Sequence, residues 1–433
     1  MWAFMVHDLA PEAAAKATST HPFTEVTHHM RPKFRHALAA TAVVGTALAL
    51  AVPAFAAGDP YFSKDTQSAP ATISGAGSTF AAPLQGTAIN AYLARNGNAT
   101  INAYQAVGSG AGEADIIKSA TTGINWGGTD VPMAAADIAK NCSSGCPAIS
   151  SFVQVPIGLG GEGMSYNVPG LKTGLHLTGA IIAGIYNGTI TKWNAPQIKK
   201  LNPKFKLPSA TIIPVFRSDS SGTSYIFTDF LATSTKSTVG HGAWPYAATK
   251  NEISTYAKTP AYGVGAAHNG GVAAAVASTK DSIGYIEYSY ILLNKKLAGS
   301  VADVLNKSGK YVAPSVKGIA ADAAAKPKVT AANFTIVFQK GATAYPIAGY
   351  TWAVVWKVQN AKNTNTANNA VAATTGTLLV KYLDWLAHTG TSSDLGGQHF
   401  AAEDGYVALP PNIQQLATST LVQVVSSSNK KLL

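Results

Sequence analysis

The stretch RSDSSGTSY, from Arg217 to Tyr225, joins a strand-like apolar run to a helix-like run through a turn of small hydroxyl residues. Gly222 lets the backbone approach a ligand closely. The first N–H groups of the following helix have no partner within it and lie at the positive end of its dipole, where anions bind. The alternative is that the Ser and Thr side chains only cap the helix. This stretch by itself leaves both interpretations open.

Two other stretches share this design, GAGSTF at Gly75–Phe80 and GSGAGE at Gly108–Glu113. Each places small residues and a hydroxyl directly before a helix-like segment. Three such turns in one chain, the third with an arginine, favour an anion-binding site over three unrelated helix caps.

Strand-like apolar runs alternate with helix-like segments along most of the chain, which favours an α/β fold. The expected strands are Ile101–Val107, Phe152–Ile157, Thr211–Phe216, Ile283–Tyr288 and Tyr350–Trp356. The expected helices are Ala82–Arg95, Glu113–Ser119, Ser224–Ala232 and Leu378–His388. Two segments rich in small and polar residues, Val301–Ala325 and Asn360–Thr377, are interpreted as surface elaborations rather than separate domains.

From Met30 the chain has the layout of a secretory signal peptide over residues 30–56. Basic residues precede an apolar stretch from Ala37 to Val52, and small residues flank position 56. We expect cleavage near Ala56 and a soluble periplasmic or secreted protein. A retained membrane anchor is the weaker alternative, because the apolar stretch is short. Residues 1–29 have neither signal-peptide nor domain character and are interpreted as a gene-model extension.

Composition excludes several classes of protein. Of the 433 residues, 47% are hydrophobic and 12% charged, with 40 Gly and 22 Pro, which argues against a coiled coil or a disordered chain. The formal charge is +11, but Lys and Arg are scattered, so the sign reflects a scarcity of acids rather than a nucleic-acid-binding surface. We therefore expect no nucleic-acid partner.

Cys142 and Cys146 are the only cysteines, in the stretch NCSSGCP. In an oxidising compartment, two cysteines this close together favour a local disulfide, and two thiols are too few for a metal site. We predict that they are bonded to each other.

Sequence patterns of enzymes are missing, since the chain has no GxxxxGK[ST], GxSxG or HExxH stretch. Its one GxGxxG, Gly158–Gly163, runs into the strand-like MSYNV rather than into a helix, which argues against a nucleotide-binding loop. The histidines, His268 among them, are expected to be surface or packing residues. We predict no catalytic residue, no metal and no cofactor.

Seven blocks resemble, in order, the phosphate-binding proteins of bacterial phosphate ABC transporters, which are members of the periplasmic binding-protein superfamily. The blocks are GAGSTF (75–80), YQAVGSG (104–110), WGGTDVP (126–132), NGTITKWN (187–194), FRSDSSGTSYIFTDFL (216–231), SIGYIEYSY (282–290) and YPIAGYTW (345–352). The resemblance implies a type II-like fold of two α/β lobes, with a ligand cleft between them and crossing hinge strands. It places 57–158 and 347–433 in lobe one and 159–346 in lobe two.

The resemblance also implies a phosphate site in that cleft. Arg217 would supply the full positive charge, because its fork matches two anion oxygens, and Asp219 would orient it. Asp130 would accept a hydrogen bond from the ligand. The implied ligand-binding residues are Thr79, Phe80, Ser109, Asp130, Arg217, Ser221, Gly222 and Thr223.

The function that the resemblance implies is capture of inorganic phosphate outside the cytoplasmic membrane by a monomer, and delivery to the permease subunits of a phosphate ABC importer. Three alternatives stay open: a secreted interaction protein that reuses the fold, a secreted phosphatase, and a binding protein for another oxyanion such as sulfate. Asp130 separates phosphate from sulfate, because a carboxylate in a dry cleft repels an anion that brings no proton.

Overall fold

The computed structural model describes residues 69–433 except positions 239, 241, 256 and 393. These residues belong to one compact unit, Ala57–Leu433. The gene-model extension, the signal peptide and the cleavage site, all expected between residues 1 and 56, lie outside the described residues. Among the helices of the described part, none is long and apolar enough to cross a membrane.

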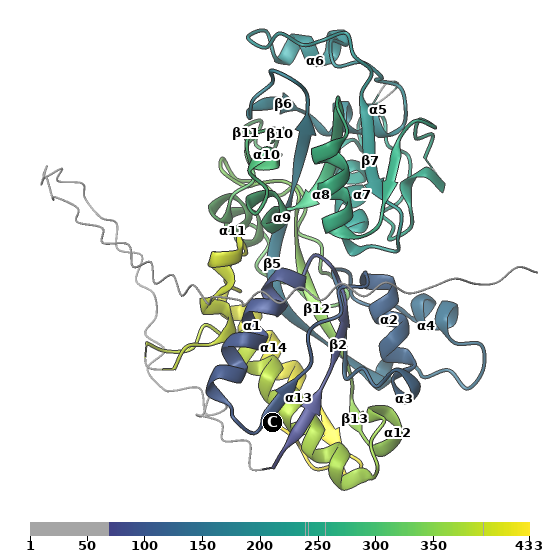
Figure 1. Ribbon diagram of the computed structural model, residues 1–433, viewed down its shortest axis with the longest axis vertical. Helices are drawn as coiled ribbons and strands as arrows, with labels where there is room; N and C mark the ends of the chain where they lie inside the picture. Colours follow the sequence, from purple (N-terminus) through teal and green to yellow (C-terminus); the bar gives the residue numbers. More distant parts are fainter. Residues whose placement is uncertain (1–68, 239, 241, 256, 393) are drawn as a thin grey trace, which may run out of the picture. The chain divides into compact units, whose positions relative to one another are not determined.

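A seven-stranded sheet forms the centre of this unit (Figure 1). In sheet order its strands are β2 (Gly75–Gly77), β4 (Trp126–Thr129), β12 (Ala348–Trp356), β5 (Phe152–Asn167), β9 (Ser282–Glu287), β7 (Ile213–Arg217) and β8 (Val264–Ala266). The order is far from the chain order, so segments distant in the sequence become neighbours.

Strand β5 connects the two parts of this sheet, β2, β4 and β12 on one side of it and β9, β7 and β8 on the other. Its first part, 152–161, pairs antiparallel with β12 with a register shift at Ile157, and 162–167 pair antiparallel with β9. The GxGxxG stretch lies inside β5 and forms no nucleotide-binding loop. Its glycines instead make room for side chains from other elements: a Cβ at Gly160 would lie 2.8 Å from the ring of Phe80.

The longer helices are α1 (Ala82–Arg95), α2 (Ser109–Ile117), α7 (Gly222–Ser234), α8 (His268–Ser278), α11 (Val316–Ala324), α13 (Asn369–Ala387) and α14 (Pro411–Leu421). Helix α1 has the predicted bounds. The helices predicted from Glu113 and Ser224 begin earlier, at Ser109 and Gly222, because their small residues form the first helical turn. The strand predicted over Ile101–Val107 is wrong for all but its first residue: β3 spans Ala99–Ile101, and of the residues after it Gln105 forms an isolated bridge with Ala76 before Gly108, with φ +95°, turns the chain into α2.

Three small sheets and several short helices complete the unit. The sheets consist of β1 (Ala71–Ile73) with β3 (Ala99–Ile101), of β6 (Leu175–Leu177), β10 (Ala302–Leu305) and β11 (Tyr311–Val312), and of β13 (Val358–Gln359) with β14 (Val425–Ser426). The short helices are α3 (Ser119–Thr122), α4 (Ala135–Asn141), α5 (Gly179–Tyr186), α6 (Pro196–Leu201), α9 (Tyr288–Leu292), α10 (Lys295–Ala298) and α12 (Ala361–Thr364).

Both 301–325 and 360–377 belong to the same compact unit and form no separate domain, as predicted, but their interpretation as surface elaborations is wrong. The first segment forms β10, which pairs with β6, and helix α11, whose Ile319 is fully buried. The second forms α12 and the first half of α13, where Ala372 is fully buried. Small residues made both segments appear flexible, whereas in the fold they allow close packing.

The predicted disulfide between Cys142 and Cys146 is present, directly after α4. It closes a short loop, so its effect is local shaping rather than a large constraint on the unfolded chain.

Candidate functional site

The three hydroxyl turns lie together, although they are far apart in the sequence. Gly108 of the second turn donates its N–H to the Gly77 carbonyl of the first, at 2.8 Å. Gly110 donates to the carbonyl of Ser220 in the third turn at 3.1 Å, and the N–H of Gly222 reaches the Ser109 hydroxyl at 3.1 Å. The starts of α1, α2 and α7 therefore surround one place.

Glycine is required where these turns meet. A Cβ at Gly222 would lie 2.5 Å from a carboxylate oxygen of Asp130, and a Cβ at Gly108 would lie 2.6 Å from one of Asp219. Since real Cβ contacts are longer than this, a side chain at either position would push the acidic residues away from the turns.

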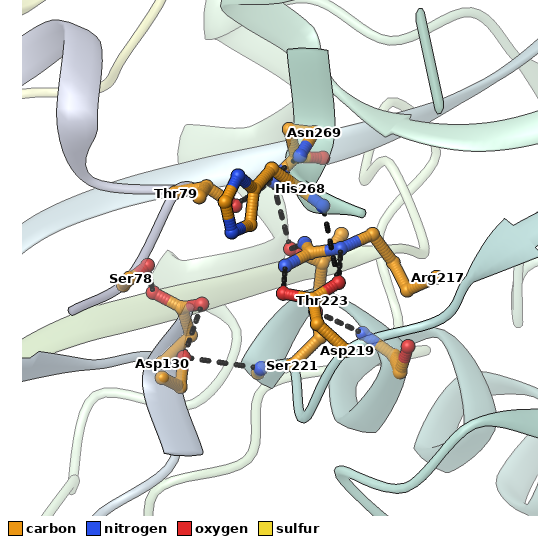
Figure 2. A network of polar contacts seen from close by, with 12 residues as sticks. Ser78, Thr79, Asp130, Arg217, Asp219, Ser221, Thr223, His268 and Asn269 are labelled. Atoms are coloured by element: carbon orange, nitrogen blue, oxygen red, sulfur yellow. Dashed lines mark hydrogen bonds and ion pairs between the residues drawn. The ribbon is translucent and has the colours of Figure 1, made fainter. Parts of the chain in front are cut away.

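Arg217 is the last residue of β7 and is 1% exposed. Its Nε donates to Oδ1 of Asp219 at 2.6 Å, Nη2 pairs with Oδ2 of Asp219, and Nη1 donates to the Thr223 hydroxyl at 3.1 Å (Figure 2). Its backbone N–H donates to the Tyr285 hydroxyl at 3.0 Å. Because Arg217 is buried, its pair with Asp219 is not an ordinary surface ion pair. Asp219 fixes the Nε and Nη2 side of the guanidinium, and Thr223 fixes Nη1.

The carboxylate of Asp219 accepts hydrogen bonds from two residues, Arg217 and His268. Besides the guanidinium, the backbone N–H of His268 donates to its Oδ1 at 3.1 Å. Burial acts to raise the pKa of Asp219, but the hydrogen bonds and charge of Arg217 outweigh it and hold that pKa below its ordinary value. Asp219 is therefore ionised throughout the physiological range.

Asp130 is 2% exposed and follows β4 directly. Its carboxylate accepts hydrogen bonds from the hydroxyl of Ser78 and, at 3.2 Å, from that of Ser109 (Figure 2). Burial raises the pKa of Asp130 to about 6, and hydrogen bonds such as that from Ser78 limit the rise. At neutral pH this residue is a buried, mostly ionised acceptor.

The first turn offers unpaired backbone donors. Within the part of the chain that the structure describes, the N–H groups of Thr79 and Phe80 donate to no protein acceptor. The Phe80 ring is fully buried and makes an edge contact with Tyr406, so packing fixes the turn. The carbonyl of Thr79 accepts from the Tyr290 hydroxyl at 2.9 Å.

In the third turn, one side chain caps helix α7 while a backbone N–H group is left available to a ligand. The Ser221 hydroxyl accepts from the Ser224 N–H at 3.2 Å, so Ser221 is a helix N-cap. The N–H of Thr223 has no acceptor among the described residues. Capping and anion binding are compatible here, because the cap uses a lone pair of Ser221 and leaves its hydrogen free.

Several residues of this network were not predicted from the sequence, Ser78, His268 and Asn269 among them (Figure 2). Ser78 lay inside the first turn and could have been included. Asn269 follows a histidine at a helix start without a hydroxyl turn, and no sequence pattern marked it. Within the described residues, no group of His, Cys, Asp or Glu side chains could hold a metal ion.

Two buried glutamates lie opposite each other across β5 and β9, Glu162 and Glu287. Both are fully buried, and neither carboxyl oxygen of Glu162 has a hydrogen-bond partner in the described part of the chain. Burial raises the pKa of Glu287 to about 8 and that of Glu162 well above its ordinary value. Glu287 is therefore mainly protonated at neutral pH, and burial favours the neutral form of Glu162 as well, which limits the negative charge near Arg217.

A sheet linked through one long strand, with helix N-termini and a buried arginine gathered at one place, defines a solute-binding protein of the periplasmic type. The chain belongs to the PBP superfamily, whose domain model matches residues 64–387. Within it, the chain belongs to the family of the phosphate-binding proteins PstS. The relative from Pasteurella multocida is 32% identical over 371 residues, 83% of this chain and 93% of the relative. That from Xylella fastidiosa is 33% identical over 350 residues, 79% and 82% of the two chains.

Solved structures confirm the predicted two-lobed fold. A high-affinity periplasmic phosphate-binding protein, PfluDING, solved with bound phosphate, matches with a TM-score of 0.62 at 22% identity over 83% of this chain and 95% of its own. The phosphate-binding protein from Stenotrophomonas maltophilia matches with a TM-score of 0.60 at 19% identity, covering 80% and 93%.

Proposed function

We propose that this chain binds inorganic phosphate outside the cytoplasmic membrane and delivers it to a phosphate ABC importer. The observation that supports this best is the buried guanidinium of Arg217, which Asp219 and Thr223 fix beside backbone N–H groups that have no acceptor among the described residues. A full charge and converging neutral donors suit a small oxyanion. The relatives named for phosphate binding point to the same ligand.

In the proposed complex, phosphate oxygens accept from the backbone of the first and third turns and from the fork of Arg217. Asp219 acts only by orienting that fork. The proposed ligand-binding residues are Thr79, Phe80, Ser109, Asp130, Arg217, Ser221, Gly222 and Thr223. Ser109, which donates to Asp130 in this structure, would have to share or redirect its hydrogen on binding.

Asp130 is the proposed selector. Its carboxylate faces an anion, which is unfavourable unless the ligand donates a proton to it. Phosphate at neutral pH is HPO₄²⁻ or H₂PO₄⁻ and has such a proton, whereas sulfate has none. A site built to receive that proton rejects the analogue lacking it.

We further propose lobes at 57–158 with 347–433 and at 159–346, joined by β5 and β12. A ligand that contacts both lobes favours the closed state, and permease subunits of the importer can recognise that state. The protein is proposed to act as an exported monomer after cleavage near Ala56. It has no catalytic role and needs no metal or cofactor.

Calorimetry with phosphate and with sulfate, on protein freed of bound anion by unfolding and refolding, tests the proposal. We expect phosphate to bind tightly and sulfate to give no heat at the same concentration. Turnover of a generic phosphoester, or equal affinity for both anions, would contradict it.

A further inference from the structure

Asn269 is a fully buried polar residue in the first turn of α8, and it contacts two of the anion-binding turns at once. Its Nδ2 donates to the hydroxyl of Thr79 at 3.2 Å and to that of Thr223 at 3.0 Å. Its backbone N–H also points to the Thr79 hydroxyl, at 3.3 Å. Figure 2 shows Asn269 on the opposite side of Arg217 from Asp130.

The orientation of the Asn269 amide is determined by its surroundings. The atom on its other side faces the backbone N–H of Glu287 at 3.0 Å. A backbone N–H can only donate, so the atom facing it is Oδ1. The NH₂ group must then face the two threonines.

This amide restricts what the threonine hydroxyls can do. A hydroxyl has one hydrogen and two lone pairs. The Thr223 oxygen accepts from Nη1 of Arg217 at 3.1 Å and from Asn269 at 3.0 Å. The Thr79 oxygen accepts from the side chain and the backbone of Asn269. With both lone pairs used, each hydroxyl is left with its hydrogen to donate, and among the described residues neither has a protein acceptor for it.

The hydroxyls on the opposite side have the reverse arrangement. Ser78 and Ser109 donate their hydrogens to Asp130. Their oxygens accept from backbone N–H groups, of Ala81 at 3.1 Å and of Gly222 at 3.1 Å. The two sides of the site therefore differ in polarity: one is an acceptor centred on Asp130, and the other consists only of donors.

We propose that Asn269 is a positioning residue that sets ligand specificity by making Thr79 and Thr223 obligatory donors. This inference rests on the proposed function and adds a second selector to it. Asp130 demands one proton from the ligand, and Asn269 forbids a ligand proton at the two oxygens that the threonines contact. The site would thus accept phosphate in one orientation and reject neutral, proton-rich analogues.

The backbone before Asn269 is consistent with this role. His268 has φ +65°, in the left-handed region, which residues other than glycine adopt uncommonly. This conformation directs the N–H of His268 to Asp219 and that of Asn269 to Thr79. Such backbone strain persists where the surrounding contacts over-determine it, and these contacts are all within the site.

A double-mutant cycle tests whether Asn269 acts through the hydroxyls. Asn269→Ala and Thr223→Val are each expected to weaken phosphate binding by about 10- to 100-fold. In the Thr223→Val background, Asn269→Ala should cost clearly less than in the wild type, because one of its two targets is already lost. In the Thr223→Ser background, which keeps the hydroxyl, its full cost should return. Equal costs in all three backgrounds would overturn the proposal.

Asn269→Asp provides a second readout, the pH dependence of phosphate affinity, which a purely structural role of Asn269 would not change. It keeps the acceptor for the Glu287 N–H but replaces the donor, so the threonine hydrogens would point to the new carboxylate. We expect phosphate affinity relative to wild type to fall at least ~100-fold at pH 8 and to recover partly at pH 5, as that carboxyl gains a proton and can donate. If the affinity of the variant relative to the wild type is the same at pH 8 and at pH 5, the inference is contradicted.

Thermal unfolding of each variant confirms that it is folded. Phosphate binding by the wild type distinguishes the proposed function from the role of Asn269. If the wild type binds no phosphate, both proposals are wrong. If it binds tightly but the affinity losses of Asn269→Ala and Thr223→Val are additive, only the role of Asn269 is overturned.

Discussion

The Nζ atom of Lys250 lies 2.6 Å from Oε2 of Glu113, a residue 137 positions away in the sequence. The same amine contacts Oδ1 of Asp137 at 2.8 Å. Glu113 is in α2, the helix that begins at Ser109, and the Lys250 carbonyl accepts the N–H of Ser221 at 2.8 Å. The ion pair therefore ties the second turn to the segment that supports the third, beside a cavity of about 460 Å³.

Lys250→Met is expected to weaken phosphate binding by about 5- to 10-fold, mainly through faster release. The loss is moderate because burial raises the pKa of Glu113 to about 7, so without its partner this carboxyl can become neutral instead of remaining as a buried charge. Stopped-flow release kinetics measure the effect. Lys140→Met is the control, since Lys140 lines the same cavity; equal release rates for both variants would show that the ion pair does not stabilise the bound state.

Arg217→Ala is expected to cost roughly 2–5 kcal/mol of phosphate binding free energy, because the anion loses its charge-assisted contact while remaining desolvated. Isothermal titration calorimetry measures this loss. Arg95→Ala is a matched control: Arg95 also pairs with an aspartate, Asp394, and should leave the affinity unchanged. Unaltered binding by Arg217→Ala would remove this residue from the site.

Asp130→Asn should narrow the gap between phosphate and sulfate, since the amide can donate where the carboxylate only accepts. Rejection of an analogue that leaves a buried polar group unpaired reaches roughly 10⁴- to 10⁵-fold in such sites. We expect the variant to bind sulfate measurably and phosphate less tightly than the wild type. The check is competition between the two anions in one titration, and a phosphate-to-sulfate ratio equal to that of the wild type speaks against the role of Asp130.

The same argument predicts a pH dependence of selectivity. Burial raises the pKa of Asp130 to about 6, so the residue is mostly ionised at pH 7.5 and mostly protonated at pH 5. Once protonated it can donate, and the penalty against sulfate should shrink as the pH falls through about 6. Sulfate titrations of the wild type at both pH values measure this, with Asp130→Asn as the reference that should not change. A sulfate affinity that is the same at pH 5 and 7.5 would contradict this prediction.

Much of the site was visible in the sequence because helix N-terminal chemistry is local. Glycine and hydroxyl residues just before a helix create backbone donors within a few positions, so the turns at Gly75–Phe80, Gly108–Glu113 and Arg217–Tyr225 could be recognised one at a time. Helix α1 was predicted with its observed bounds, Ala82–Arg95, because a single helix is recognisable from the residues along it.

Only the tertiary structure decided which groups face one another. Asn269 meets Thr79 across 190 positions, and Lys250 meets Glu113 across 137, because sheet order and the register of β5 against β12 and β9 bring their elements together. The same packing buries Glu162 and Glu287 and shifts their pKa values upward. The glycine and hydroxyl residues of the three turns, by their positions in the sequence, determined where backbone donors occur along the chain. The direction of each hydrogen bond and the charge of each carboxyl depend on burial and on partners that are distant in the sequence, and these exist only once the sheet has formed.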